Sequence, residues 1–274
     1  MNIFSSDTFV SDIQSGKTIF FFLKAGDDII ASCFLEKFPA MVRLYRFRSL
    51  REFINQSFEI FVKHLYSLSI NFHVPLFHTT INFPFNSDLK NSLLKENFTF
   101  YDRKNMILPL ISFPDQPTPD FGSFTTNSNI SEFASEIINL TILSAKNSID
   151  ALIYPEFSEF SSLSSTYGLN NPTNHFYNEK ASVLLFDNDL LIGVNLITLD
   201  GDDSSIIWQL AVHPNYRRQK LGYKLMIKSI LALKSLDRER LSLSVSVGNP
   251  AALLYESLGF IYQNDPFTVI TKNY

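Results

Sequence analysis

The sequence predicts an α/β (α+β) protein in which a mixed, mostly antiparallel sheet is flanked by helices, and it predicts this arrangement twice. Between residues 130 and 274, short apolar runs of strand type alternate with longer segments of helical periodicity. A similar order of segments precedes it between residues 18 and 97. Three prolines within six positions, Pro114 to Pro119, lie between the halves. Proline removes amide donors and resists helix, so this segment favours an extended linker.

Composition bounds the class of protein. The chain has 274 residues, of which 45% are hydrophobic and 18% charged, which is typical of a globular, core-forming protein. Its net charge of −4 argues against nucleic acid as the main partner and mildly favours a cationic, amine-bearing substrate. No apolar run approaches the length of a membrane span, so we expect no membrane association. The expected location is the cytoplasm, with secretion by a route that needs no cleaved signal left open.

Cysteine and histidine usage argues against disulfides and metals. The single cysteine, Cys33, excludes an internal disulfide and a cysteine-based metal site. The five histidines lack the spacing of metal ligands. We therefore expect no metal cofactor.

The C-terminal half has the clearer element pattern. Apolar residues at helical spacing predict a helix over 130–147, with Ser131 as its N-cap. The further predicted elements are strands at 181–186, 190–199 and 205–212, a helix at 222–236, a strand at 241–247, a helix at 250–258 and a β-rich end at 266–271. In the strand at 241–247, aliphatic residues alternate with serine, which indicates one buried face.

The N-terminal half repeats this order less clearly. Its predicted elements are strands at 18–23, 29–38 and 40–47, a helix at 51–68, a strand at 78–83 and a helix at 86–96. Asn86 opens the last of these helices, as Asn249 precedes the helix at 250–258. A plain α/β docking domain is the alternative interpretation.

The segment 212–226 carries the strongest functional signal. An apolar strand leads into a proline turn, a basic loop with Arg217 and Arg218, and then Gly222 at the start of a helix. Backbone amides at such a helix start point to one spot, the helix dipole favours an anion there, and arginine adds positive charge. This pattern predicts a phosphate-binding loop, although a basic helix start is often only a solvated surface.

A second motif follows about 25 residues on, where a strand leads into Asn249-Pro250 and a helix that ends at Leu258-Gly259-Phe260. Together the two motifs resemble the acetyl-CoA signature of the GNAT (Gcn5-related N-acetyltransferase) superfamily, whose loop reads Arg/Gln-x-x-Gly-x-Gly/Ala. Arg217 and Gly222 match this pattern, whereas Lys220 stands where the first glycine is usual. If that position requires positive φ, Lys220 adds strain that glycine would not.

The resemblance implies a tandem GNAT protein that uses acetyl-CoA as cosubstrate. The expected domains are 1–112, a degenerate GNAT-like domain for substrate binding or structure, a linker at 113–129, and an acetyl-CoA-binding domain at 130–274. The N-terminal half lacks any glycine at 48–52, where its own cofactor loop would fall. In the C-terminal domain the resemblance assigns cofactor binding to Leu210, Ala211, Val212, Arg217, Arg218, Gln219, Lys220, Leu221, Gly222, Tyr223 and Asn249.

Catalytic roles are implied for fewer residues. Tyr255 matches the tyrosine that protonates the departing CoA thiolate in many family members; its alternative role is a core residue. Asn249 matches an asparagine that contacts the pantetheine arm, and it is equally suited to cap the following helix. Where several members carry a glutamate base, this chain has Ile206 and Ile207. The turn residues Asp200, Asp202 and Asp203 are weak candidates, so no base is assigned.

The predicted function is transfer of an acetyl group from acetyl-CoA to a primary amine of a protein or small molecule, by direct attack in a ternary complex. The alternatives are a non-catalytic acyl-CoA-binding or protein-interaction module and an enzyme that uses another acyl chain. Some tandem GNAT proteins are bacterial effectors, so the resemblance leaves a host-protein target open. The acceptor groove would be lined by residues such as Asp150, Tyr154, Glu156, Glu159 and Asp265.

Overall fold

The structure is a computed structural model of residues 1–274, and it describes residues 18–37, 42–71, 76–81, 86–167, 177–263 and 267–273. The chain forms two compact units. The N-terminal unit consists of Met1–Asp102 together with Phe267–Tyr274, and the C-terminal unit consists of Arg103–Pro266. The last strand of the chain therefore belongs to the N-terminal unit.

These boundaries differ from the expected ones at 112 and 130. The strand β5 (Thr99–Pro109) crosses the boundary between the units, so its second part belongs to the C-terminal unit. The proline-containing segment also belongs to that unit, where Phe113 and Phe121 are buried. Lys234 Nζ donates to the Phe113 carbonyl at 2.9 Å. The prolines thus mark an absence of helix but not a division between units.

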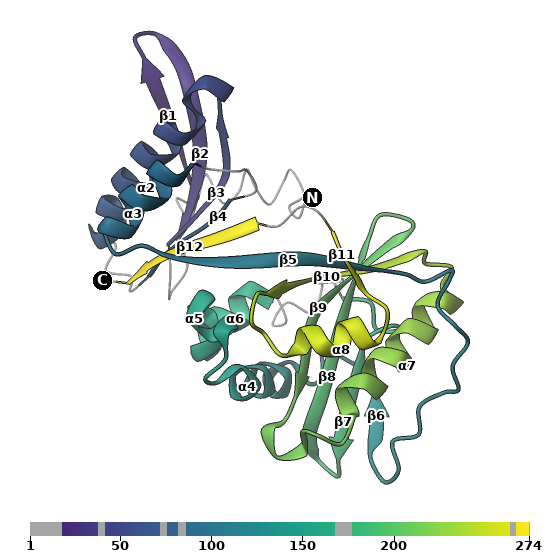
Figure 1. The fold of residues 1–274 in the computed structure, drawn as a ribbon. Coiled ribbons are helices and arrows are strands. Elements are labelled where there is room, and N and C mark those ends of the chain that lie inside the picture. The colour runs from purple at the N-terminus through teal and green to yellow at the C-terminus, as the bar shows by residue number, and fades with distance from the viewer. Residues whose placement is uncertain are drawn as a thin grey trace. The chain divides into compact units, whose positions relative to one another are not determined.

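The N-terminal unit has one sheet with helices against it. Its elements are β1 (Thr18–Ala25), β2 (Asp28–Lys37), β3 (Val42–Ser49), a 3-10 helix at Arg51–Phe53, α2 (Ile54–Asn71), β4 (Leu76–Ile81), α3 (Ser87–Lys95), the start of β5, and β12 (Phe267–Asn273). The pairs β1–β2, β2–β3 and β4–β12 are antiparallel, and β3–β4 is parallel. α2 and α3 lie on one side of this sheet (Figure 1). Parts of three expected strands, at 38, 40–41 and 82–83, lie outside the described residues.

The C-terminal unit repeats this plan. Its elements are the second part of β5, β6 (Thr125–Asn127), α4 (Ala134–Ala145), α5 (Ile149–Ile153), a 3-10 helix at Pro155–Ser158, α6 (Phe160–Tyr167), β7 (Val183–Asp187), β8 (Leu190–Asp200), β9 (Ser204–Val212), a 3-10 helix at Pro214–Tyr216, α7 (Leu221–Ser235), β10 (Arg240–Ser246), α8 (Ala251–Ser257) and β11 (Ile261–Tyr262). The pairs β7–β8 and β8–β9 are antiparallel, β9–β10 is parallel, and β10–β5 is antiparallel.

Each unit therefore has three antiparallel strands, a helix, a parallel strand, another helix and a closing antiparallel strand. That closing strand comes from the opposite part of the sequence in both cases: β12 pairs with β4, and β5 pairs with β10. The predicted fold class, a mixed sheet flanked by helices and built twice, is confirmed.

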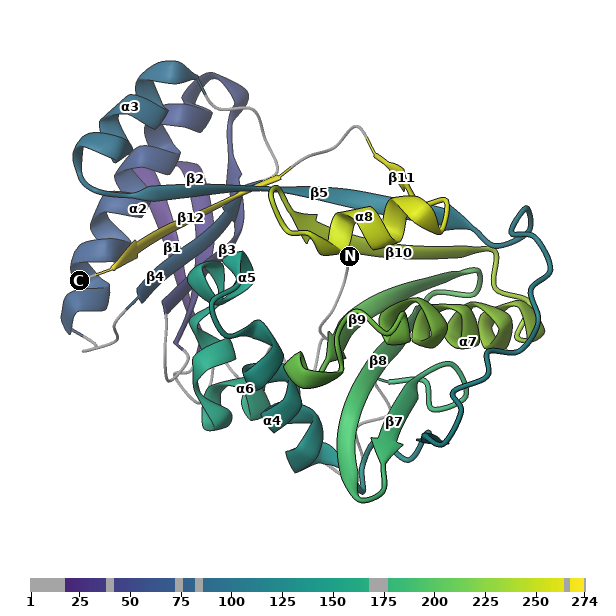
Figure 2. The same ribbon diagram turned by 60° about the horizontal axis from the view of Figure 1, so that its bottom comes forward.

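Helices cover both faces of the C-terminal sheet. Figure 2 shows α4 and α6 on one side of β8 and β9 and α7 on the other. Apolar side chains from α7, α8, β5 and β10 form one core, which includes Met106, Ile230 and Leu243. Those of α4 and α6 pack on β7 to β9 in a second core.

One local prediction in this unit was wrong. The helix expected over 130–147 begins only at Ala134, and its N-cap is Phe133 rather than Ser131. The Ser131 hydroxyl instead donates to the side chain of Asn129 at 3.0 Å, so a polar turn precedes the helix.

Candidate functional site

The sheet opens where β9 and β10 diverge. The two parallel strands pair only at Arg240–Ser242 with Ser204–Ile206, although β9 continues to Val212 and β10 to Ser246. On its other edge, β9 stays paired with β8, with a bulge at Trp208. Bulges bend a strand and re-aim its residues. Leu210, Ala211 and Val212 thus have one main-chain edge that no described strand occupies.

The loop after β9 has the geometry of an anion site. Arg218 and Lys220 both have left-handed backbones, with φ of 67° and 57°, and Lys220 is the residue directly before α7. Within the described part of the chain, the amides from Arg218 to Tyr223 donate to no protein acceptor, and Lys224 is the first that does, to the Lys220 carbonyl at 3.0 Å. Converging free amides at a helix N-terminus favour phosphate.

The side chains of this loop divide into two groups. Arg218, Gln219 and Lys220 are exposed, and Leu221 is buried in the core. Arg217 is bound back to the protein, since its Nη2 donates to the Ser144 carbonyl at 2.7 Å. That carbonyl lies in the last turn of α4, so Arg217 fixes the loop to α4. The side chains of Arg218, Gln219 and Lys220 and the free amides are therefore the groups of this loop that a ligand could contact.

Gly222 and Tyr223 occupy the first turn of α7. A Cβ atom at Gly222 would lie 3.4 Å from Leu254 Cδ2 and 3.8 Å from Val212 Cγ2. A methyl group at this position would therefore make ordinary contacts with α8 and β9. The side chain of Tyr223 is 36% exposed.

A polar cluster lies at the end of β10. Asp150 Oδ1 accepts from Ser246 Oγ at 2.6 Å and from Arg103 Nη1 at 3.2 Å, and its Oδ2 accepts from Asn249 Nδ2 at 2.7 Å. Arg103 also donates to Ser246 Oγ at 2.8 Å and to the Ser244 carbonyl at 2.9 Å. These residues come from β5, α5, β10 and the loop before α8.

The N-cap residue of α8 is Pro250 and not Asn249, but the Asn249 side chain still bonds the start of the helix. Its Oδ1 accepts from the amide of Ala251, the first residue of α8, at 2.9 Å. Because its Nδ2 donates to Asp150, the carboxamide has one defined orientation. A contact between Asn249 and pantetheine stays a prediction.

Tyr255 is buried in α8 and packs against Phe260, with ring centroids 5.8 Å apart. Burial raises the pKa of its hydroxyl well above the usual value, the carboxylate of Asp150 raises it further, and Arg103 lowers it. Tyr255 is therefore protonated at neutral pH. Tyr255 is a core residue, and the charges of Asp150 and Arg103 also shift the pKa of its hydroxyl.

The weak base candidates lie elsewhere. Asp200 ends β8, Asp202 and Asp203 lie in the turn before β9, and the loop 213–220 follows the other end of β9, about 27 Å away at strand geometry. Asp203 pairs with Arg240, and the Asp202 carbonyl accepts from Arg238 at 2.5 Å. This turn fastens β9 to β10 and is far from the loop.

The residues expected to line the acceptor groove lie in different surroundings. Asp150 belongs to the polar cluster, and the Tyr154 ring stacks under the Arg103 guanidinium at 5.1 Å. Glu156 is buried and Glu159 is exposed. Asp265 lies outside the described residues. Sequence reasoning missed Arg103, because it lies before the expected domain boundary on a strand that local pattern did not indicate.

The part of the chain that the structure describes contains no group of three or more His, Cys, Asp or Glu side chains that could hold a metal ion. Nor does any helix in these ranges have the length and apolarity needed to cross a membrane.

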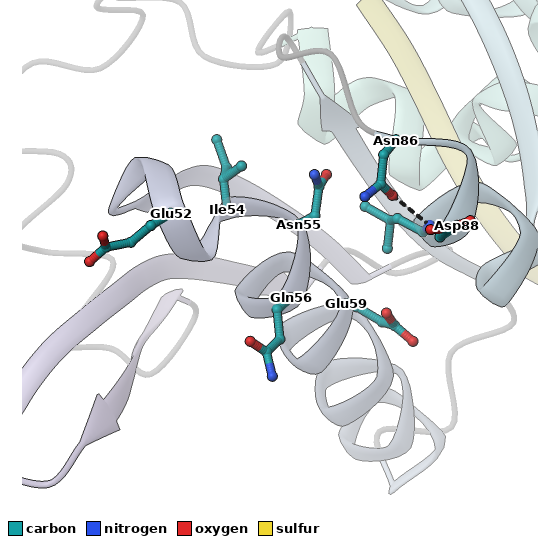
Figure 3. A pocket seen from close by; sticks show the side chains of 8 residues that line it. Glu52, Ile54, Asn55, Gln56, Glu59, Asn86 and Asp88 are labelled. Atoms are coloured by element: carbon teal, nitrogen blue, oxygen red, sulfur yellow. Dashed lines mark hydrogen bonds between the residues drawn. The ribbon is translucent and has the colours of Figure 1, made fainter.

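The N-terminal unit differs at the corresponding place. Only Leu50 separates β3 from the 3-10 helix that precedes α2, so no loop comparable to 213–220 exists there. Instead, a pocket of about 330 Å³ lies at the starts of α2 and α3 (Figure 3). The acidic residues Glu52, Glu59 and Asp88 are among those that line it, and Glu59 forms an ion pair with Lys63 at 2.8 Å. Their charge disfavours the phosphates of a nucleotide cofactor.

Comparison with known proteins agrees with this geometry. Residues 169–262 match the family model described as an acetyltransferase (GNAT) domain. This part of the chain is therefore similar to a GNAT domain. No curated protein matches the sequence at a significant level.

Solved structures show the GNAT fold over almost the whole chain. A GCN5-related N-acetyltransferase from Sphaerobacter thermophilus has a TM-score of 0.66 at 15% identity and covers 98% of this chain and 85% of its own. A functionally unknown conserved protein from Staphylococcus epidermidis has a TM-score of 0.61 at 11% identity, over 92% of this chain and 95% of its own. A tandem GNAT protein from the clavulanic acid biosynthesis pathway has a TM-score of 0.55 at 12% identity, over 94% and 83%.

Proposed function

We propose that the C-terminal unit binds acetyl-CoA and transfers its acetyl group to a primary amine of a protein or small molecule, within a ternary complex. The observation that carries the proposal is the run of unbonded amides from Arg218 to Tyr223 beside the opening between β9 and β10. The amides would hold the pyrophosphate, with the cations of Arg218 and Lys220 nearby. The free edge of Leu210–Val212 would pair with the pantetheine arm.

In this proposal the amine nitrogen attacks the thioester carbonyl carbon, and the carbon–sulfur bond then breaks. Tyr255 donates its hydroxyl proton to the departing thiolate. Its raised pKa keeps the hydroxyl protonated before reaction and also makes it a weaker acid, so the transfer depends on placement of the hydroxyl beside the sulfur. The incoming ammonium must lose a proton first. No described side chain is assigned to that step, and water can carry it.

A non-catalytic acyl-CoA-binding module is the second candidate, and the left-handed Lys220 favours it, because this position departs from the family pattern. Tyr255, which only the enzyme needs as a proton donor, favours the enzyme. The two candidates predict the same cofactor binding and differ in turnover.

The test uses the full chain, because β5 and β12 join the units. Calorimetric titration with acetyl-CoA should show one site per chain, lost in Gly222→Asp and retained in Glu59→Gln. Incubation with acetyl-CoA and a panel of amines should then release free thiol. Binding without thiol release from any amine would support the non-catalytic module, and binding that survives Gly222→Asp would overturn the proposed site.

The role of the N-terminal unit, substrate binding or structure, also stays a proposal. Its pocket carries carboxylates that would attract a cationic amine more than a CoA phosphate. A Glu59→Gln/Asp88→Asn variant should leave acetyl-CoA affinity unchanged. A raised KM for the amine in that variant would support substrate binding.

A further inference from the structure

The ion pair between Arg103 and Asp150 lies within the proposed active unit and is largely shielded from water. The side chain of Arg103 is 11% exposed and that of Asp150 is 26% exposed. Removing two charges from water costs free energy that their mutual attraction often does not recover. A contribution to stability therefore does not by itself explain a charged pair at this position. The hydrogen bonds that the pair makes indicate a further role.

The contacts lead from the pair to α8. Asp150 Oδ2 holds Asn249 Nδ2 at 2.7 Å, and Asn249 Oδ1 in turn accepts from the Ala251 amide at 2.9 Å. Ala251 is the first residue of α8, and Tyr255 follows one helical turn later. This chain of hydrogen bonds, which we call the relay, therefore runs from Asp150 through Asn249 to Ala251. It ends on the helix that carries Tyr255, the proposed acid.

We propose that Asp150 is a positioning residue for acetyl transfer: held by Arg103 and Ser246, it fixes the carboxamide of Asn249 and thereby the first turn of α8 and Tyr255. The inference rests on the proposed function, since it assigns Asp150 to the same site. Asp150 does not touch the reacting atoms in this assignment.

Charge adds to this geometric role. When Tyr255 gives its proton to the thiolate, a tyrosinate forms in buried surroundings, and the Arg103 cation favours that anion. Asp150 disfavours it and keeps the hydroxyl protonated before the step. Arg103 lowers and Asp150 raises the pKa of Tyr255, both less strongly than burial raises it. Asp150 therefore favours the protonated hydroxyl before the reaction, and Arg103 favours the tyrosinate that forms during it.

Two variants separate the geometry from the charge. In Asp150→Asn, only one of the two side-chain atoms still accepts. The Arg103 cation and the Ser246 hydroxyl hold that oxygen, so the new NH2 group faces Asn249 Nδ2, donor meets donor, and the hydrogen bond to Asn249 is lost. Adding Asn249→Asp reverses the bond, because the new amide at position 150 then donates, and the new carboxylate at position 249 accepts from it and from the Ala251 amide. We expect Asp150→Asn to lower kcat about tenfold or more, and the double variant to recover most of that loss.

The deciding experiment places Asp150→Asn in a Tyr255→Phe background and measures kcat at saturating acetyl-CoA and amine. If Asp150 acts through Tyr255, the substitution has little further effect once the hydroxyl is gone. If its role is only structural, the two losses multiply, and that result overturns the inference. Wild-type-like turnover of Asp150→Asn would overturn it as well.

Controls keep the outcomes distinct. Circular dichroism melts and acetyl-CoA affinity are measured for every variant. Should Asp150→Asn not fold, Arg103→Lys takes its place, because lysine keeps the cation but cannot reach both Ser244 and Ser246 in the fork geometry of arginine. A wild-type chain that binds acetyl-CoA and acetylates no amine overturns the proposed function and this inference with it. An active wild type with multiplying losses overturns the inference alone.

Discussion

Gly222 lies against Leu254, close enough that an added Cβ would stand 3.4 Å from Leu254 Cδ2 and meet no other side chain nearer than that. This spacing is an ordinary tight contact and not a clash. Gly222 has no left-handed φ, in contrast to Lys220 two residues before it. Neither backbone conformation nor packing against Leu254 therefore requires glycine here, and its remaining effect is to leave the amides at the start of α7 open.

Gly222→Asp should weaken acetyl-CoA binding at least 100-fold, about 2.8 kcal/mol. A carboxylate at this helix start would repel the pyrophosphate and occupy the space where it meets the amides. Gly222→Ala is the matched control, since its methyl group fits against Leu254 with a small shift. Titration calorimetry measures both. Equal losses in the two variants would assign the effect to packing and contradict the electrostatic explanation.

Lys220→Gly should raise the stability of the chain. Lys220 has a φ of 57°, which costs an ordinary L-residue about 1 kcal/mol relative to glycine. Relief of this strain should raise Tm by about 2–4 °C. Lys220→Ala removes the same cation but keeps the strain, so it should not gain stability. A melt of Lys220→Ala that matches Lys220→Gly would show that the charge, and not the backbone, is responsible.

The loop and α8 illustrate what the sequence could predict. The proline turn, the basic loop and the helix start, expected at Gly222 and found at Leu221, are local, so adjacent residues determine them. Gly259 ends α8 as expected, with a φ of 89° and the Phe260 amide bonded to the Tyr255 carbonyl at 3.1 Å. Lys220 does have the positive φ at which an L-residue is strained and glycine is not.

Long-range pairing was beyond local pattern. Nothing in residues 99–109 indicates that they pair with 240–246, or that the chain's last strand pairs with residues 76–81. The polar cluster was missed for the same reason. Arg103, Asp150 and the pair Ser246 and Asn249 come from three distant parts of the sequence, and only the fold brings them together.

The exchange of strands gives a prediction about fragments. A fragment of residues 130–274 lacks Met106, Leu108 and Leu110, which are 0–3% exposed in the core of the C-terminal unit. Loss of each such side chain costs about 2–5 kcal/mol, which exceeds typical stability when summed. We expect this fragment to show no cooperative melt, whereas a fragment of 103–263 should show one. Cooperative melting and acetyl-CoA binding by 130–274 would contradict the strand assignment.

Tyr255→Phe should lower kcat by about 10²–10⁴-fold with little change in acetyl-CoA affinity. Phenylalanine keeps the ring contact with Phe260 and the burial of α8, and only the hydroxyl proton is lost. A positioned proton transfer is worth about that factor in rate. An effect confined to kcat is expected when an interaction made only in the transition state is removed.

The pH dependence follows from the burial of the same hydroxyl. Because burial raises the pKa of Tyr255 above its usual value, the group stays protonated from acidic pH to beyond about pH 10. The wild-type rate should therefore show no alkaline decline from Tyr255 between about pH 7 and 10, whereas amine deprotonation should raise the rate across this range. Steady-state kinetics with an accepted amine, followed by thiol release, measure both profiles. A turnover of Tyr255→Phe within about threefold of wild type would assign thiolate protonation to water, leaving Tyr255 as a core residue whose hydroxyl takes no part in the reaction.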